Sequence, residues 1–319
     1  MKALAHNPDA ATDFFSATEP QDNAQYLLKD RLPMNDVVPD SMGVGGSVDD
    51  YKGPKAIYEA TGDALVAAAT GVDPNDSSAR PPEHTGQHRQ VLDSSLKYLA
   101  ERGDDFPAEM RDDMAIVLTN HGDTVHHSAS ALADDPKDPK LLDRNQLLEV
   151  SKQVSRDQNA YGMLNEGLNQ EIYRDIRENN ADDPKETLQR AGGTVGFLEQ
   201  ARYQALVTDR DDPSWDAKWM YHGFGSIVNF VPGVGDIAQR GVDAVTYEWQ
   251  QQEQERIDAI QQQDNEKTFA GRERQLQALA DAWIEAKPDH GSSRFVITGE
   301  INGSAYDANS RVKGLEGGG

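Results

Sequence analysis

The residues best suited to chemistry lie in the segment NHGDTVHHS, which holds three histidines and an aspartate. Imidazole and carboxylate groups bind metals, so Asp123, His126 and His127 are candidate ligands for a metal-dependent enzyme built on the His121–His127 cluster. On a helix His121 falls on an apolar stripe, whereas the other three point away from it. Helical zinc sites usually space two histidines four residues apart, and that spacing is missing here. We therefore expect His121 in the core, Asp123 and His127 as an exposed pair, and no metal.

A second pair, His84 and His88 in EHTGQH, does have the four-residue spacing. Pro81, Pro82 and Gly86 surround it and disfavour the helix that would bring both imidazoles to one side. We expect a solvated loop at this place. The sequence also lacks the signatures of zinc proteases, serine hydrolases and P-loop NTPases. No catalytic residue and no cofactor are predicted, and a non-enzyme is favoured.

The glycine-rich stretch from Gly223 to Val245 is the most apolar part of the chain. It formally matches a dinucleotide fingerprint, but Asp236 would set a carboxylate beside the pyrophosphate. A membrane-inserting hairpin stays open as an alternative, although the uncharged run would reach only about 20 Å as a helix, against ~30 Å of hydrocarbon. The favoured interpretation is a buried corner between two helices, formed by Val231, Pro232, Gly233, Val234, Gly235 and Asp236.

The composition narrows the classes of partner. The 319 residues carry a formal net charge of -24 and include no cysteine. The acidic field repels phosphate backbones, so no nucleic acid is expected, and other proteins are the expected partners. Disulfides and cysteine-ligated metals are excluded. The N-terminal residues do not resemble a signal peptide and no single helix is expected to span a membrane, which leaves the cytoplasm or export by a non-classical route.

Helix starts recur as an Asx residue followed by proline. The Asx side chain caps the first turn, and the N–H that proline lacks would have no partner within the helix at this position. These sites are Asn7-Pro8, Asp73-Pro74, Asp135-Pro136, Asp138-Pro139, Asp183-Pro184 and Asp212-Pro213. Apolar residues at three- and four-residue steps predict amphipathic helices, one of them with a stripe from Met110 to Val125.

The spacing of apolar residues between Arg144 and Asn179 predicts one long helix of ~50 Å. It is expected to form an antiparallel hairpin with Lys185–Thr208, whose start is marked by Asp183, Pro184 and Glu186. The polar segment that follows the glycine-rich stretch is expected to form largely solvated helices with a thin apolar seam that ends at Leu276, Leu279 and Trp283.

The predicted fold class is all-α, a bundle of amphipathic helices with a long antiparallel helical hairpin. A short β element is expected at RFVITGEI, residues 294–301, the only segment with strand character. We divide the chain into residues 1–140, a helical region with two loops rich in proline and glycine; residues 141–290, with the hairpin, the glycine-rich corner and the polar helices; and a tail, residues 291–319.

Several segments resemble known proteins. FVPGVGDIAQRGVDAV is similar to the IPGVGD segment of actinobacterial polymorphic toxins. ALAHNPDAATDFF, NAQYLLKDR, TGDALVAAATG and DMAIVLTNHGDTVHHS resemble a family of long, helical, uncharacterised actinobacterial proteins linked to WXG-type, type VII secretion. The similarity runs to about Lys287, whereas no toxin domain follows PGVGD and the WXG spacing is not found at Trp219.

The resemblance implies no active site. It implies a non-catalytic scaffold or delivery module of an exported effector or toxin system, with a secretion or immunity protein as partner. Two alternatives stay open: a membrane-active, pore-forming or inserting protein that uses Gly223–Val245, and the metal-dependent enzyme built on His121–His127.

Overall fold

The computed structural model describes residues 1–30, 53–76, 78–131, 140–178, 184–208 and 270–315. These ranges contain helices and no strand, which confirms the predicted all-α class. The α-helices are α1 (Lys2–Ala5), α2 (Pro8–Ser16), α3 (Asn23–Gln25), α4 (Gly53–Thr70), α5 (Gly86–Ala100), α6 (Arg111–Asn120), α7 (Gly122–Ser130), α8 (Arg144–Val154), α9 (Gln158–Glu178), α10 (Pro184–Thr208), α14 (Ala270–Ala286) and α15 (Arg294–Leu315). Short turns add a π-helix at Tyr26–Asp30 and 3₁₀ helices at Gly103–Asp105 and Ala108–Met110.

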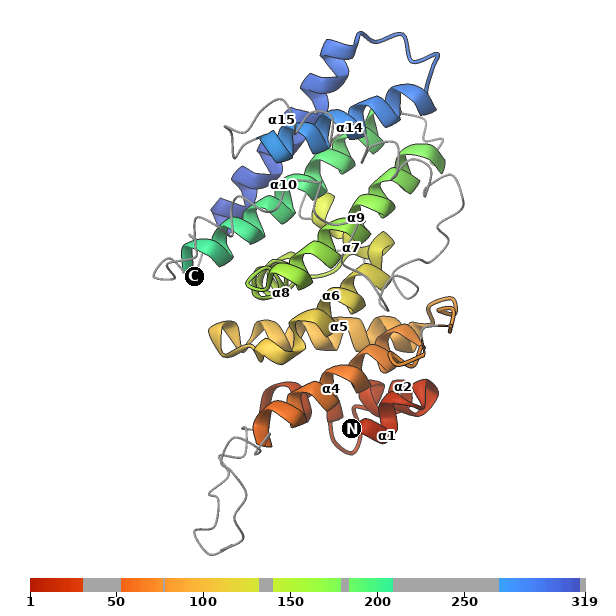
Figure 1. Cartoon of the computed structure of the whole chain (residues 1–319), viewed down its shortest axis with the longest axis vertical. Helices are drawn as coiled ribbons and strands as arrows, with labels where there is room; N and C mark the ends of the chain where they lie inside the picture. The colour runs from red at the N-terminus through yellow and green to blue at the C-terminus, as the bar shows by residue number, and fades with distance from the viewer. Residues whose placement is uncertain (31–52, 77, 132–139, 179–183, 209–269, 316–319) are drawn as a thin grey trace, which may run out of the picture.

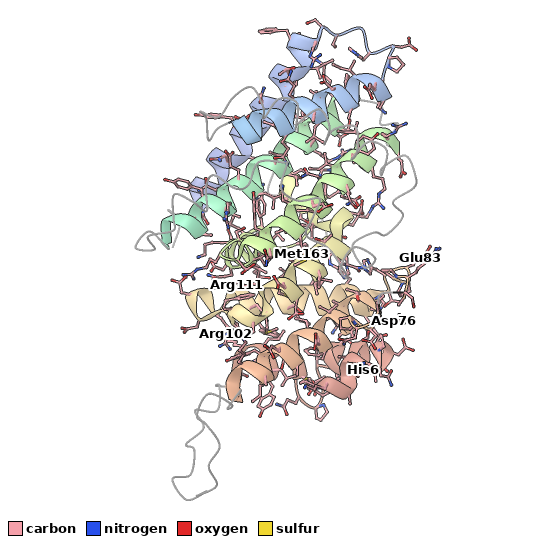
Figure 2. The ribbon with its side chains drawn as sticks, viewed as in Figure 1. His6, Asp76, Glu83, Arg102, Arg111 and Met163 are labelled. Atoms are coloured by element: carbon pink, nitrogen blue, oxygen red, sulfur yellow. The ribbon has the colours of Figure 1, made fainter. Side chains whose placement is uncertain are left out.

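The helices stack along the longest axis of the molecule, broadly in chain order (Figure 1). One end is formed by α1, α2 and α4, the middle by α5 to α9, and the other end by α10, α14 and α15. Met163 lies in the middle of the stack, while Asp76 and Glu83 lie at one side and Arg102 at the other (Figure 2).

Two large apolar clusters lie in the interior of the described part of the chain. The first runs from α2 to α10 and includes Leu164 and Leu168 of α9. The second is formed by α9, α10, α14 and α15, and it includes Ile172 and Ile176 from the following turns of α9. Because α9 and α10 contribute to both clusters, these two helices join the halves of the stack.

Side-chain caps set several of the helix starts. Asn7 accepts a hydrogen bond from the Ala10 N–H at 3.3 Å and Pro8 begins α2, as predicted. Asp143 caps α8 by accepting the Gln146 N–H at 3.0 Å. The prediction at Asp73-Pro74 was wrong, because the Asp73 carboxylate accepts the N–H of Asn75 and forms a local turn instead of a helix start.

The single long helix predicted from Arg144 is two helices. α8 ends before Ser155, and α9 starts where the Asp157 carboxylate accepts the N–H groups of Asn159 and Ala160. Apolar periodicity continues through this break, so it conceals the capping aspartate. α9 and α10 are packed neighbours that run in opposite directions (Figure 1), so the predicted antiparallel hairpin is formed by these two helices.

The stripe from Met110 to Val125 is also divided between two helices. His121 ends α6 with φ −91° and ψ 28°, and α7 begins at Gly122. Nε2 of the His121 ring lies 2.9 Å from the carbonyl oxygen of Ala69 in α4. A tertiary hydrogen bond of this kind is not visible in a periodic pattern.

The C-terminal segment corrects two predictions. RFVITGEI is the start of α15, because Ile297, Ile301 and Ala305 are buried against neighbouring helices and tertiary packing overrides the β propensity of this segment. α14 is not largely solvated either, since Leu276, Leu279 and Trp283 are all buried in the second cluster. The predicted tail thus contains a helix from residue 294 to residue 315.

Several predictions fall outside the described residues. They include the corner at residues 231–236, the whole stretch 223–245, and the cap Asp183. The division of the chain at residues 140 and 290 also stays a prediction. Within the described ranges, no helix combines the length and the apolar character that a membrane crossing requires.

Candidate functional site

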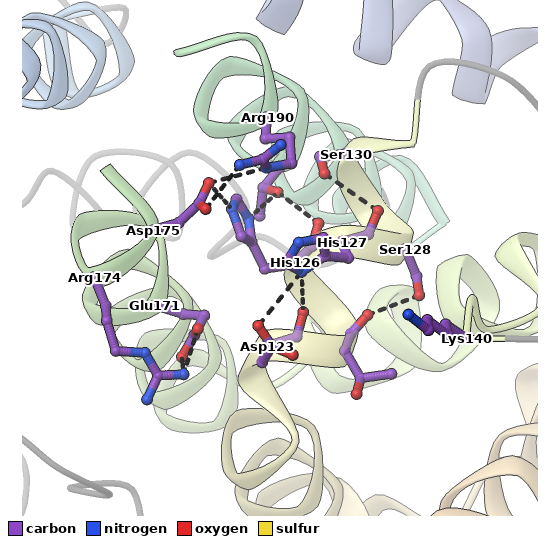
Figure 3. Close-up of polar contacts among 12 residues, drawn as sticks. Asp123, His126, His127, Ser128, Ser130, Lys140, Glu171, Arg174, Asp175 and Arg190 are labelled. Atoms are coloured by element: carbon purple, nitrogen blue, oxygen red, sulfur yellow. Dashed lines mark hydrogen bonds and ion pairs between the residues drawn. The ribbon is translucent and has the colours of Figure 1, made fainter. Parts of the chain in front are cut away.

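The most connected polar group in the described interior lies where α7, α9 and α10 meet, and we call it the three-helix junction. It consists of His126, Asp175 and Arg190, which Figure 3 labels, together with Thr194. His126 of α7 is completely buried. Its Nδ1 lies 2.7 Å from Thr194 Oγ1 of α10, and its Nε2 lies 3.3 Å from Asp175 Oδ2 of α9.

Arg190 completes the junction from α10. Its Nε and Nη2 donate to the two oxygens of Asp175 at 3.0 and 2.8 Å, and its Nη1 donates to Glu186 at 2.8 Å. Two parallel N–H groups on one carboxylate make a bidentate pair, which fixes both partners in orientation as well as distance. The junction therefore joins three helices through one carboxylate.

Burial determines the charge of His126. Removal from water lowers the pKa of the His126 imidazole, while the hydrogen bond and the charge of Asp175 partly oppose this effect. The nearby His127 and Arg190 lower the pKa further. His126 is therefore neutral at pH 7.

The three predicted metal candidates do not converge on one point. Asp123 and His127 form an exposed pair, with His127 Nδ1 at 3.5 Å from Asp123 Oδ1, as predicted. His126 was predicted to point away from the apolar side, and this was wrong: its ring is buried and faces Asp175 and Thr194. Across the described ranges, no group of three or more His, Asp or Glu side chains could hold a metal ion.

Three further histidines, His84, His88 and His121, lie together beside α4, α5 and α6. The rings of His84 and His121 are parallel at 3.7 Å between centroids, and His88 meets His84 edge-on at 5.9 Å. His84 Nε2 lies 2.7 Å from Asn120 Oδ1. The predicted solvated loop was therefore wrong at His88, which is buried in the first turn of α5 and shares a capping box with Thr85.

His121 behaves as predicted, since it is a buried core residue. Its distance of 2.9 Å from the Ala69 carbonyl and its contact with His84 give it a structural role. The three histidines of this stack can be found in the sequence, but the sequence does not show that they lie together. Their assembly depends on the turn at Gly71, whose φ of +71° brings Pro82 and His88 against the end of α4.

A second polar layer connects α9 to α14. Gln275 of α14 donates to Asn169 Oδ1 at 2.7 Å, and both amides are buried. Trp283 Nε1 donates to Thr187 Oγ1 of α10 at 3.1 Å. Nearby on α9, burial raises the pKa of Glu166 to about 7. The hydrogen bonds of Gln275 and Trp283 position α14 against α9 and α10.

An apolar surface is formed by the outer face of α15, which we define as Phe295, Val296, Gly299, Asn302, Gly303 and Tyr306. Phe295 is 87% exposed and Tyr306 is 67% exposed. The spacing of three and four residues places the members on one side of the helix, opposite the buried Ile297, Ile301 and Ala305. Nothing described lies within 4 Å of a Cβ built at Gly299 or Gly303.

Sequence reasoning missed Asp175, Arg190 and Thr194. The sequence does indicate the ion pair between Glu186 and Arg190, because these residues are four positions apart on a predicted helix. No local pattern connects them to His126, which is 68 positions from Thr194 and 49 from Asp175.

Chemically, the junction resembles a hydroxyl, imidazole and carboxylate relay, but both Thr194 and His126 are fully buried. A substrate needs access to the hydroxyl of such a relay. The arrangement therefore acts as a structural connection between helices. Comparison of the chain with protein-family models, with curated proteins and with solved structures finds no match.

Proposed function

We propose that this protein is a non-catalytic helical scaffold that binds another protein through the outer face of α15. The observation that carries the proposal is the exposure of Phe295 and Tyr306 three helical turns apart on one uncharged stripe. Aromatic side chains are enriched at protein interfaces, where they supply large contact area at low entropic cost. Exposed apolar surface arranged in this way is typical of interaction sites.

The charge of the chain favours a particular kind of partner. A net charge of -24 produces a field that accelerates encounter with a basic protein and disfavours acidic ones. The outer face of α15 itself has no charged member, so it provides the desolvated centre of an interface. We propose a partner with an apolar patch surrounded by lysine and arginine.

The buried polar groups support a structural role for the rest of the molecule. The three-helix junction and the Gln275–Asn169 pair join helices to one another. Placement of the scaffold in an exported effector or toxin system stays a prediction that rests on the sequence resemblance. Membrane activity of residues 223–245 likewise stays a prediction, because these residues lie outside the described ranges.

The proposal is tested by affinity capture from the native host with three versions of the purified chain. The wild type and Tyr26→Ser, which changes an exposed aromatic in the short helix packed against α3 and α5, are expected to retain the same stoichiometric partner. Phe295→Ser combined with Tyr306→Ser is expected to lose it. Equal capture by all three versions contradicts the role of α15, and the absence of a stoichiometric partner contradicts the scaffold function.

A further inference from the structure

The hydrogen bonds at His126 determine where its protons lie. Asp175 receives two N–H groups from Arg190, so it is an ionised carboxylate that can only accept hydrogen bonds. His126 Nε2, at 3.3 Å from Asp175 Oδ2, must therefore carry a proton. In the neutral ring Nδ1 is then the acceptor, and the Thr194 hydroxyl donates to it at 2.7 Å.

Thr194 has a second acceptor within reach. Its Oγ1 lies 3.2 Å from the main-chain carbonyl oxygen of His126. A hydroxyl has one proton, so it can donate to Nδ1 or to this carbonyl, but not to both at full strength. The same oxygen retains lone pairs that can accept a hydrogen bond from Nδ1.

We propose that His126 is a reversible proton-binding site of the folded protein, in which the Thr194 hydroxyl changes its acceptor when the imidazole gains a proton. The added proton comes from solvent and binds Nδ1, which then donates to Thr194 Oγ1. The Thr194 hydroxyl hydrogen turns from Nδ1 to the carbonyl oxygen of His126. Nε2 continues to donate to Asp175, so only hydrogen atoms move and each polar atom keeps a partner.

The surrounding charges set the balance between the two states. Within α7, His127 faces the ring edge-on at 5.6 Å between centroids and is paired with Asp123. From α9 come Asp175 and the Glu171–Arg174 pair, and from α10 comes Arg190, which also binds Glu186. Asp175 favours the imidazolium, whereas Arg190 and burial oppose it. The site is thus expected to fill only below the ordinary titration range of histidine.

This arrangement differs from an ordinary buried histidine. A buried imidazole without an acceptor for its second N–H takes up a proton mainly by unfolding. At His126 both ring nitrogens already have an acceptor nearby: Asp175 Oδ2 lies beside Nε2, and Thr194 Oγ1 lies beside Nδ1. The protein is therefore expected to remain folded while His126 gains its proton, and the uptake occurs at the point where α7, α9 and α10 are joined.

The test is nitrogen-15 NMR of the histidine side chains between pH 8 and pH 4, recorded together with circular dichroism. At pH 8 the wild type is expected to show His126 as the Nε2–H tautomer, and on acidification its signals shift to imidazolium values before the helical signal is lost. Thr194→Ser keeps the hydroxyl and is expected to behave in the same way. Thr194→Val removes the acceptor and is expected to lower the pKa of His126, so that protonation and unfolding occur together.

Three results would overturn the proposal. One is an Nδ1–H tautomer in the wild type at pH 8, which decides the matter even if Thr194→Val does not fold. Another is a wild-type His126 that remains neutral until the helices unfold. The third is a Thr194→Val variant whose His126 titrates as it does in Thr194→Ser.

Discussion

Gly196 in α10 lies directly against the backbone of Ala305 in α15. A Cβ atom at position 196 would stand 2.1 Å from the carbonyl oxygen of Ala305, and one at Gly192 would stand 2.3 Å from that of Ile301. Real Cβ atoms do not approach a backbone so closely, and a rotamer change cannot relieve contact with main-chain atoms. The two glycines therefore allow the close packing that holds α15 with its aromatic stripe facing outward.

Replacement of Gly196 by alanine is expected to separate the two helices. The overpacking should lower the free energy of unfolding by ~1–3 kcal/mol, more than the gain of up to ~1 kcal/mol that alanine brings to a helix interior. Gly303→Ala is the matched control, because a Cβ at that position meets open space. Urea denaturation should show a loss for Gly196→Ala and none for Gly303→Ala, and equal effects would contradict the packing described.

The bidentate pair of Arg190 and Asp175 predicts a large effect of removing the cation. Arg190→Met leaves the buried Asp175 carboxylate without its guanidinium, which should cost about 3–5 kcal/mol. Arg294→Met breaks the more exposed pair with Asp281 and should cost at most ~1 kcal/mol. Thermal and chemical denaturation of both variants would measure the difference, and similar losses would show that the junction contributes little.

Glu166 predicts a pH dependence of stability. Burial raises its pKa in the folded state from 4.5 to about 7, so the folded protein holds a proton here that the unfolded chain releases. The contribution of Glu166 to the free energy of unfolding is fully present below pH 4.5, falls as the pH rises towards 7, and is lost above pH 7. Glu166→Gln, which stays neutral, should be more stable than the wild type at pH 8 by on the order of 1–3 kcal/mol and similar to it at pH 4.

The matched control for Glu166 is Glu178→Gln, at an exposed position of the same helix. Its free energy of unfolding is expected to follow that of the wild type at both pH values. A benefit of Glu166→Gln that is the same at pH 4 and pH 8 would mean that ionisation is not its cause.

The positions of Asp123, His126 and His127 predict independence from metal. Both ring nitrogens of His126 lie against Thr194 and Asp175 and not against the exposed pair, so the three side chains do not converge on one point. Addition of a chelator should leave the melting temperature unchanged, and elemental analysis should find no stoichiometric transition metal. A bound metal whose removal lowers the melting temperature would contradict this account.

The helices could largely be predicted because their evidence is local. Asn7-Pro8 and Pro184 mark real helix starts, and Met114, Val117 and Leu118 are buried as their spacing indicates. Breaks inside a continuous stripe were not visible, since Asp157 and His121 interrupt helices without disturbing the apolar period. RFVITGEI was misassigned because the glycine face of α10, more than a hundred residues earlier, decides its conformation.

The candidate site could be predicted only in part. The sequence indicated that Asp123 and His127 form an exposed pair and that His121 belongs to the core. The burial of His126 depends on Asp175 and Arg190, which lie on separate helices and give no joint signal in one sequence. Long-range polar contacts of this kind require knowledge of how helices pack.

We propose that this scaffold binds its protein partner through the outer face of α15. Hydroxyl-radical footprinting of the purified chain, alone and in its captured complex, tests it most directly. In the chain alone Phe295 and Tyr306 should be oxidised readily, as their exposure implies, whereas the buried Phe197 should react slowly. In the complex Phe295 and Tyr306 should be protected; if they react as fast as in the chain alone while another surface is protected, the partner binds elsewhere and the claim is wrong.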